Sequence, residues 1–211
     1  MNTVAKMAGI GCLVGFVLLL FSRPATAEAT NKPSNPAAQE RLLFVSECWD
    51  NHKPETFDNA LRFFQSLRAE YPDTLEAELA YVEVLRIRWL KGDGQAVTAD
   101  YATWLATEPS PIAQGHALRY FADDAAQRKD YAKAETLYKQ AITLAGTHIV
   151  AGLAAVNLAE LYLNNLNRPL EGKTLFEQTA KQFTGSPIEP EIRRRWANAL
   201  DFFAANASPV A

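Results

Sequence analysis

Helix-breaking residues recur along this chain at a constant spacing. Stretches with helical periodicity end at Pro72, at Pro109 and at Gly146, and 37 positions separate each of these residues from the next. Proline lacks the amide donor and glycine readily leaves the helical conformation, so both residues end helices. A repeat of this length predicts one supersecondary unit per repeat, stacked on its neighbours. A fourth, less regular copy follows between Arg168 and Gly185.

The most regular copy is the stretch 129–144, whose apolar and small residues recur every three or four positions. These residues are Tyr131, Ala134, Tyr138, Ala141 and Leu144. Ala134 and Ala141 leave room for a neighbouring helix, and Tyr138 fills the gap between them. The stretch therefore predicts a helix that is buried on one side and packed closely against another helix.

This pattern resembles the second helix of a tetratricopeptide repeat, in which an aromatic start is followed by small, aromatic and small residues. The resemblance covers residues 38–205 and implies an all-α fold, a right-handed α-solenoid of about four helical hairpins with a C-terminal capping helix. The repeats are a few positions longer than the family's usual ~34 residues, so a related helical-hairpin solenoid remains an alternative. No strand-like alternation competes with the helical pattern.

Each repeat helix has a predicted partner helix upstream, and the two form a hairpin. The upstream helices are expected at Ala38–Asp50, Leu75–Lys91, Ile112–Arg128 and Ile149–Leu166. A ninth helix is expected at Glu191–Ala205, because a solenoid needs its last apolar face covered. The stripe that would cover this face consists of Ile192, Trp196, Leu200 and Phe203.

Residues 1–27 have the three parts of a secretory signal peptide. Lys6 supplies a positive start, a mostly apolar run follows over residues 8–21, and Ala25-Thr26-Ala27 offers a cleavage site. We therefore expect cleavage after Ala27 and a mature domain that is secreted or periplasmic. The alternative is an uncleaved leader, in which residues 8–21 anchor the domain to the inner membrane, facing the periplasm.

The whole chain has the composition of a globular protein, with 48% hydrophobic and 21% charged residues. The formal net charge is −3, and no basic block is longer than Arg193-Arg194-Arg195, so nucleic acid is not expected as a partner. Residues 28–37 contain two prolines without periodicity and are expected to form a flexible linker. Residues 206–211 are expected to form a disordered tail.

The sequence carries no pattern that indicates catalysis. Its histidines are His52, His116 and His148, and none has another His or Cys at metal-ligand spacing. It has no Gly-x-Ser-x-Gly elbow and no phosphate-binding glycine loop. Cys48, which follows the leader, is interpreted as a small buried hydrophobe, with a reactive thiol as the alternative. We therefore expect a non-enzymatic protein without a metal or cofactor.

In the tetratricopeptide family, the first helices of successive hairpins line a concave groove, and this implies candidate binding residues here. Aligned on the helix breakers, the positions that would face the groove are Trp49, His52, Arg86, Trp89, His116, Arg119, Asp123, Glu160 and Asn164. Aromatic and charged groups of this kind anchor peptides and partner helices. The alternative for each residue is core packing or ordinary solvated surface. If the set lies on the surface, replacing Arg86, Arg119 and Asp123 with alanine should leave stability nearly unchanged.

One known specificity of the family does not carry over to this chain. Members that grip a C-terminal carboxylate use Lys, Arg and Asn at fixed positions of their first helices. The matching positions here are Val45 and Trp49, Val82 and Arg86, Arg119 and Asp123, and Val156 and Glu160. That carboxylate clamp is therefore absent from the predicted groove.

These observations predict an exported adaptor or scaffold that holds a protein or peptide partner during assembly or maturation of an envelope complex. A second hypothesis is an extracytoplasmic component that binds a small ligand for a transporter or enzyme, with an apolar pocket near Trp89 and His116. A third is an enzyme or redox subunit that uses Cys48 or a histidine. Membrane contact is expected only if the leader stays as an anchor.

Overall fold

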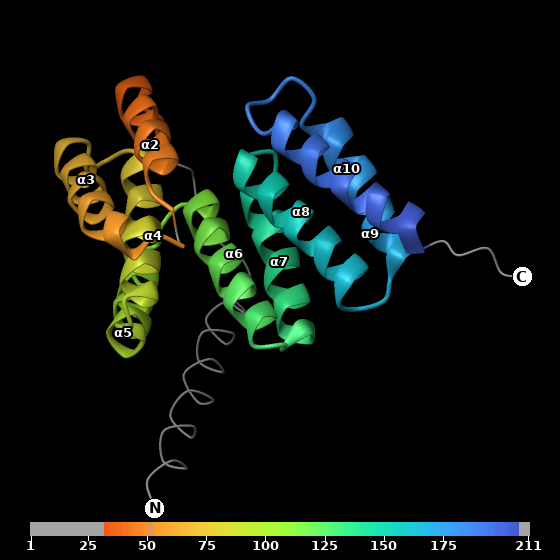
Figure 1. Cartoon of the computed structure of the whole chain (residues 1–211). Helices are drawn as coiled ribbons and strands as arrows, with labels where there is room; N and C mark the ends of the chain where they lie inside the picture. Colours follow the sequence, from red (N-terminus) through yellow and green to blue (C-terminus); the bar gives the residue numbers. More distant parts are fainter. Residues whose placement is uncertain (1–31, 51, 207–211) are drawn as a thin grey trace, which may run out of the picture. The chain divides into compact units, whose positions relative to one another are not determined.

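The computed structural model describes residues 32–50 and 52–206, apart from the side chains of residues 47–48 and 201–206. Within this part of the chain it contains nine α-helices, one short 3-10 helix and no β-strand (Figure 1). The all-α class is therefore confirmed. The predicted leader, the first part of the predicted linker and residues 207–211 lie outside the described residues. None of the described helices is long and apolar enough to span a membrane.

The helices group into two compact units whose boundary in the chain falls between Ser110 and Pro111. The first unit contains α2 (Pro36–Cys48), the 3-10 helix η1 (Pro54–Thr56), α3 (Phe57–Glu70), α4 (Leu75–Leu90) and α5 (Gly94–Leu105). The second unit contains α6 (Pro111–Gln127), α7 (Tyr131–Ala145), α8 (Ile149–Asn164), α9 (Pro169–Gln182) and α10 (Glu189–Asn206). The upstream helices of the hairpins and the last helix begin and end within two residues of their predicted bounds, although the sequence pattern treats residues 38–205 as one domain.

The helix ends follow from local chemistry that the sequence already carries. Asn35 accepts hydrogen bonds from the backbone amides of Ala37 and Ala38 at 3.0 and 3.2 Å and so caps α2. Thr74 caps α4 in the same way. At the end of α7, Gly146 adopts a φ of 58°, a conformation that favours glycine. The predicted breaker Gly146 therefore ends α7 through its own backbone preference.

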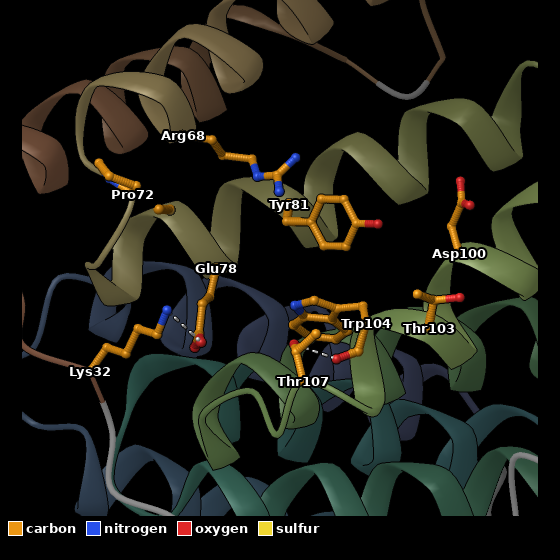
Figure 2. Close-up of a pocket in the computed structure, with 10 residues that line it drawn as sticks. Lys32, Arg68, Pro72, Glu78, Tyr81, Asp100, Thr103, Trp104 and Thr107 are labelled. Carbon is orange, nitrogen blue, oxygen red and sulfur yellow. Dashed lines mark hydrogen bonds and ion pairs between the residues drawn. The ribbon is translucent and has the colours of Figure 1, made fainter.

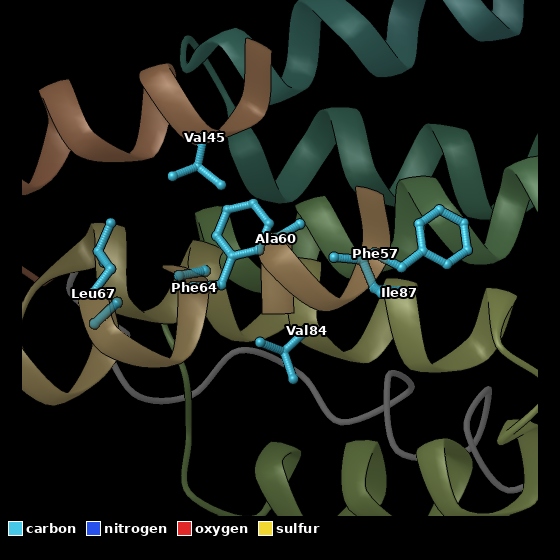
Figure 3. Packing of buried hydrophobic residues seen from close by; sticks show 9 residues of the cluster. Val45, Phe57, Ala60, Phe64, Leu67, Val84 and Ile87 are labelled. Atoms are coloured by element: carbon cyan, nitrogen blue, oxygen red, sulfur yellow. The ribbon is translucent and has the colours of Figure 1, made fainter. Parts of the chain in front are cut away.

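The core of the first unit forms where α2, α3 and α4 pack together (Figure 3). Its members are Val45 from α2, Phe57, Ala60, Phe64 and Leu67 from α3, and Ala77, Ala80, Val84 and Ile87 from α4. The helical spacing of the apolar residues on α3 places them on one face of that helix. Helix α4 differs, because most of its residues are buried, glutamates at its N-terminal end included.

The segment that precedes α2 is held against the N-terminal end of α4. The Leu75 amide donates to the Pro33 carbonyl at 3.1 Å. The buried Glu76 carboxylate accepts from the Asn35 amide at 3.0 Å and from the Ser34 hydroxyl. A buried carboxylate is costly without donors around it, so Glu76 holds this segment in place. This corrects the expected flexible linker over its described part, and α2 already begins at Pro36.

In the second unit, α6 and α7 approach so closely that their backbones touch. A Cβ atom added to Gly115 would lie 2.9 Å from the Ala141 carbonyl oxygen and 3.2 Å from the Ala145 Cβ atom. Tyr138, on the same helix as Ala141, is also buried. The close packing predicted from the small residues of this repeat is therefore confirmed.

Helix α10 packs on α8 and α9, as a covering helix should. Ile192 is fully buried, and the Trp196 ring stacks on Phe176 with centroids 5.0 Å apart. Leu200 departs from the predicted stripe, since 43% of its surface is exposed. The fourth stripe residue, Phe203, has its side chain outside the described part. The prediction was therefore right for the first turns of this helix and wrong for Leu200, where the neighbouring helices leave the stripe uncovered.

A charged cluster around Glu135 joins α7, α8 and the start of α9. Arg168 donates to the Glu135 carboxylate at 3.0 and 2.9 Å, and the Tyr162 hydroxyl donates at 2.9 Å. Lys139 adds a fourth hydrogen bond at 2.6 Å. Burial by itself raises the pKa of Glu135, but the hydrogen bonds from Lys139, Arg168 and Tyr162 outweigh it and lower the pKa from 4.5 to about 2.

We expect Gly115→Val to reduce the free energy of unfolding by ~1–3 kcal/mol, because the new side chain must push α6 away from α7. Urea denaturation followed by circular dichroism measures this difference. The matched control is Ala132→Val on the exposed side of α7, which should cost only about 0.5 kcal/mol through helix propensity. Equal effects of the two substitutions would contradict the close approach.

The Glu135 cluster predicts a defined dependence of stability on pH. Because folding lowers the pKa of Glu135, its contribution is fully present above about pH 4.5 and is lost as the pH falls towards 2. We expect Glu135→Gln to cost about 1–2 kcal/mol at neutral pH, with solvent screening allowed for, and progressively less below pH 4.5. Unfolding measured from pH 7 to pH 2.5 tests this.

The matched control for this experiment is Glu177→Gln, which removes an exposed ion pair with Lys173 at 3.8 Å. Exposed pairs contribute less than about 1 kcal/mol, so this variant should change stability little at neutral pH. A constant difference between wild type and Glu135→Gln at all pH values would show that the carboxylate charge is not what stabilises the cluster.

Candidate functional site

The predicted groove residues of the first unit divide between core and surface. Trp49 packs against the core cluster and lies edge-on to Phe57, with ring centroids 6.0 Å apart. The Arg86 guanidinium lies over the Trp49 ring at 5.4 Å, so these two candidates meet. His52 is exposed in the turn that follows α2. The Trp89 ring lies next to Gly94, where an added Cβ atom would be 3.6 Å from the ring.

The candidates His116 and Arg119 lie on α6 in the second unit. The His116 side chain is buried, and its ring centroid lies 4.8 Å from that of Tyr120. The Arg119 guanidinium lies 4.1 Å from the centroid of the same Tyr120 ring. His116 and Arg119 therefore meet the same ring on α6, and both of their side chains are largely buried.

The third candidate on α6, Asp123, joins three helices. Its carboxylate accepts from the Tyr138 hydroxyl of α7 at 2.6 Å and from the Asn157 amide group of α8 at 2.8 Å. Arg119 adds an ion pair at 3.6 Å. These contacts predict that replacement of Asp123 with alanine lowers stability, contrary to the expectation for a surface residue, because two donors would lose their acceptor.

The last two candidates lie on α8. Arg195 of α10 donates to the Glu160 carboxylate through Nε at 2.7 Å and through a second guanidinium nitrogen. Glu160 therefore joins the covering helix to α8, which is a structural role. Asn164 is exposed at the last position of α8.

The first unit contains a pocket of about 450 Å³ that lies outside this predicted set (Figure 2). Its walls come from the end of α3, from α4, from α5 and from the residues that flank these helices. The lining residues are Lys32, Arg68, Pro72, Ala77, Glu78, Tyr81, Asp100, Thr103, Trp104 and Thr107. A volume of this size accommodates a small molecule or a few side chains of a partner.

Aromatic rings form one side of the pocket. The Tyr81 and Trp104 ring centroids lie 5.7 Å apart. The fully buried Tyr101 ring also packs against Trp104, with centroids 5.6 Å apart. Burial raises the pKa of Tyr81, so its hydroxyl is protonated at neutral pH. The rings sit on helices, and this gives the pocket a preformed apolar surface.

The charged groups of the pocket differ in how they are satisfied. Glu78 accepts from the Ser110 amide at 3.0 Å and pairs with Lys32 at 3.5 Å. Asp100 is bound by a guanidinium nitrogen of Arg88 at 2.5 Å. Arg68 lies over the Tyr81 ring at 4.0 Å and, among the residues that the structure describes, makes no hydrogen bond or ion pair.

Sequence reasoning missed this site because its residues carry ordinary signals one at a time. In the sequence, Arg68 is an ordinary basic residue in the last turn of a predicted helix. Lys32 belongs to the stretch that was predicted to be a linker. A usable signal was the set of large aromatic residues at Tyr81, Tyr101 and Trp104 on consecutive helices. Only the packing of α3, α4 and α5 brings these groups to one place.

The described residues contain no group of three or more His, Cys, Asp or Glu side chains that could hold a metal ion. Cys48 ends α2, and its side chain lies outside the described part of the chain. No family model, curated protein or solved structure matches the chain.

We expect Asp123→Ala to lower the free energy of unfolding by ~1–3 kcal/mol, because it leaves the Tyr138 and Asn157 donors without their acceptor. The adjacent Asp124→Ala is the control, since among the described residues Asp124 forms its ion pair along its own helix, with Arg128 at 3.0 Å. That change should cost less than ~0.5 kcal/mol. Chemical denaturation of both variants measures these differences. An unchanged free energy of unfolding in Asp123→Ala would show that Asp123 has no role in stability and remains a candidate surface residue.

Proposed function

We propose that the chain is an exported, non-catalytic adaptor, built as an α-solenoid of helical hairpins with a covering helix. It holds a protein or peptide partner in the cell envelope, and the pocket of the first unit receives part of that partner. Three independent features support the proposal: the repeat, the leader and the pocket.

The packing of helices within each unit supports the solenoid. In addition to neighbouring helices, contacts join α2 to α4 in the first unit, and α6 to α8 and α8 to α10 in the second. The first helices of successive hairpins are in contact in such an arrangement. Together with the spacing of 37 residues between helix breakers, these contacts favour stacked hairpins in each unit.

The observation that carries the binding role is the composition of the pocket. Tryptophan, tyrosine and arginine are the residue types that contribute most to protein recognition, and Arg68, Tyr81 and Trp104 lie together there (Figure 2). Because these side chains are held by packed helices, the pocket is formed before a partner arrives. A preformed site lowers the conformational entropy lost on binding.

The sequence of residues 1–27 supports a place outside the cytoplasm, since it has the charged start, apolar run and small-residue end of a signal peptide. The partner would then be a protein of the cell envelope. The second candidate function, a component that binds a small ligand, is favoured by the pocket volume of about 450 Å³, which suits a small molecule equally well.

The proposal is tested by cross-linking the full-length chain in intact cells of its own source and identifying captured proteins by mass spectrometry. We expect one stoichiometric protein partner, captured at least about tenfold less by Arg68→Gln, since a lost charge-assisted contact costs at least ~1.4 kcal/mol. Arg62→Gln is the matched control, because Arg62 is exposed on the same helix and lies outside this pocket.

Equal capture by wild type and Arg68→Gln would remove the pocket from the adaptor function. A small molecule that copurifies with the wild-type chain, together with the absence of any protein partner, would favour the ligand-binding component instead. Both variants should melt close to the wild-type temperature, which shows that any loss of capture reflects binding.

A further inference from the structure

We propose that the pocket of the first unit binds a carboxylate attached to an apolar or aromatic group, with Arg68 as the residue that pairs with the carboxylate. This inference rests on the proposed function and deepens it, because it names the chemistry of the group that the pocket receives. It is carried by the charges, the aromatic surface and the shape of the site.

Arg68 is the lining charge that the described part of the protein does not neutralise. Glu78 is satisfied by Lys32 and Ser110, and Asp100 by Arg88 at 2.5 Å. The other described charges of the pocket thus have internal partners, whereas the half-buried Arg68 guanidinium has an aromatic ring. A partly desolvated cation without an acceptor is unfavourable, so an incoming anion gains more here than at an exposed arginine.

Burial disfavours the charged form of Arg68. Desolvation lowers the pKa of Arg68, and the nearby Tyr81 opposes the shift. An arginine stays protonated at neutral pH in any protein environment, so its positive charge remains in a partly desolvated place. An anion that pairs with the guanidinium offsets part of this cost.

The geometry of Arg68 suits a planar anion. Its guanidinium lies 4.0 Å from the centroid of the Tyr81 ring, so one flat face of the group is occupied. The N–H donors of a guanidinium lie in its plane and point along its edges, which remain available to a carboxylate in the bidentate arrangement. In Figure 2, Tyr81 lies between Arg68 and Trp104, so the anion site and the aromatic surface are adjacent.

The rest of the lining specifies what the carboxylate is attached to. Trp104 and Tyr81 supply ring surface, and Pro72 and Ala77 add apolar atoms. Thr103 and Thr107 line the same pocket from α5 and its end. A ligand that extends from Arg68 over Tyr81 towards Trp104 therefore needs a flat or apolar body next to its charge.

The same charges argue against other ligand classes. A phosphate or other dianion would bring two negative charges to a pocket in which Arg68 is the one described lining charge without an internal partner of opposite sign. A cation would find both of these carboxylates already bound by Lys32 and Arg88. A single negative charge is the best match to a site with one unneutralised positive group.

This site differs in position from the groove predicted from the repeat. Arg68 lies on α3 and Trp104 on α5, the second helices of two successive hairpins, and the lining residues from the first helix α4 are Ala77, Glu78 and Tyr81, none of which belongs to the predicted groove. The carboxylate has two possible sources: a free small molecule, or the acidic side chain or C-terminus of a peptide. Both present the same chemical group to Arg68.

The test is isothermal titration calorimetry on the full chain with matched charged and neutral probes. The small-molecule pair is 4-phenylbutyrate and 4-phenylbutyramide, which differ in charge and not in shape. The peptide pair is a capped tetrapeptide that contains Phe-Glu and the same peptide with Phe-Gln. A free C-terminus on the Phe-Gln peptide tests the terminal carboxylate.

We expect at least one acid probe to bind about tenfold more tightly than its amide, a difference of ~1.4 kcal/mol. Arg68→Gln should abolish this preference, Arg68→Lys should keep part of it, and Arg62→Gln should leave it unchanged. Added salt should reduce the preference, because the interaction is electrostatic. The probe that shows the largest preference identifies the source of the carboxylate.

Equal binding of acid and amide, tighter binding of an amine probe such as 4-phenylbutylamine, or no binding of any probe to the folded chain would overturn the inference. An acid preference retained in Arg68→Gln would also overturn it. Loss of partner capture in Arg68→Gln without any acid preference would leave the adaptor standing and remove only this inference. An acid preference without any captured protein partner would support the carboxylate site and remove the adaptor function.

Discussion

The burial of acidic groups on α4 is the constraint on which the first unit depends. Glu76 and Glu78 are both almost fully buried, and neither can remain so without donors. Glu76 obtains them from the segment before α2, and Glu78 from Lys32 and from the Ser110 amide. These two carboxylates therefore hold the segment before α2 and the residue that ends the unit against one helix, and Glu78 also shapes one wall of the pocket.

Three other carboxylates form hydrogen bonds that join helices within the second unit. Glu135 joins α7, α8 and the start of α9, Asp123 joins α6, α7 and α8, and Glu160 joins α8 to α10. In each case a carboxylate serves as a shared acceptor between helices that meet at their polar edges. Arg68 contrasts with this pattern, because the described chain supplies it with an aromatic ring and no acceptor. That contrast is the physical reason to look for its partner outside the chain.

The helices could be predicted well because their signals are local. Helical periodicity, the caps Asn35 and Thr74 and the breaker Gly146 act over a few residues, and the predicted bounds of the upstream helices and the last helix lie within two residues of those observed. The candidate site was predicted less well. Trp49 packs on the core, and Asp123 joins helices. The spacing of residues shows which of them share a helical face, but it does not show which other helix packs against that face.

The sequence by itself determined which segments are helical, where they end and which face of each is apolar, since these properties depend on side chains within one or two turns. The small residues Ala134 and Ala141 also predicted a closely packed neighbour for α7, and the structure shows that this neighbour is α6 at Gly115. The tertiary structure alone decided which charges are neutralised and which meet an aromatic ring. Those outcomes depend on residues as distant in sequence as Lys32, Arg68 and Trp104, and only the packing of the first unit brings them to the walls of one pocket.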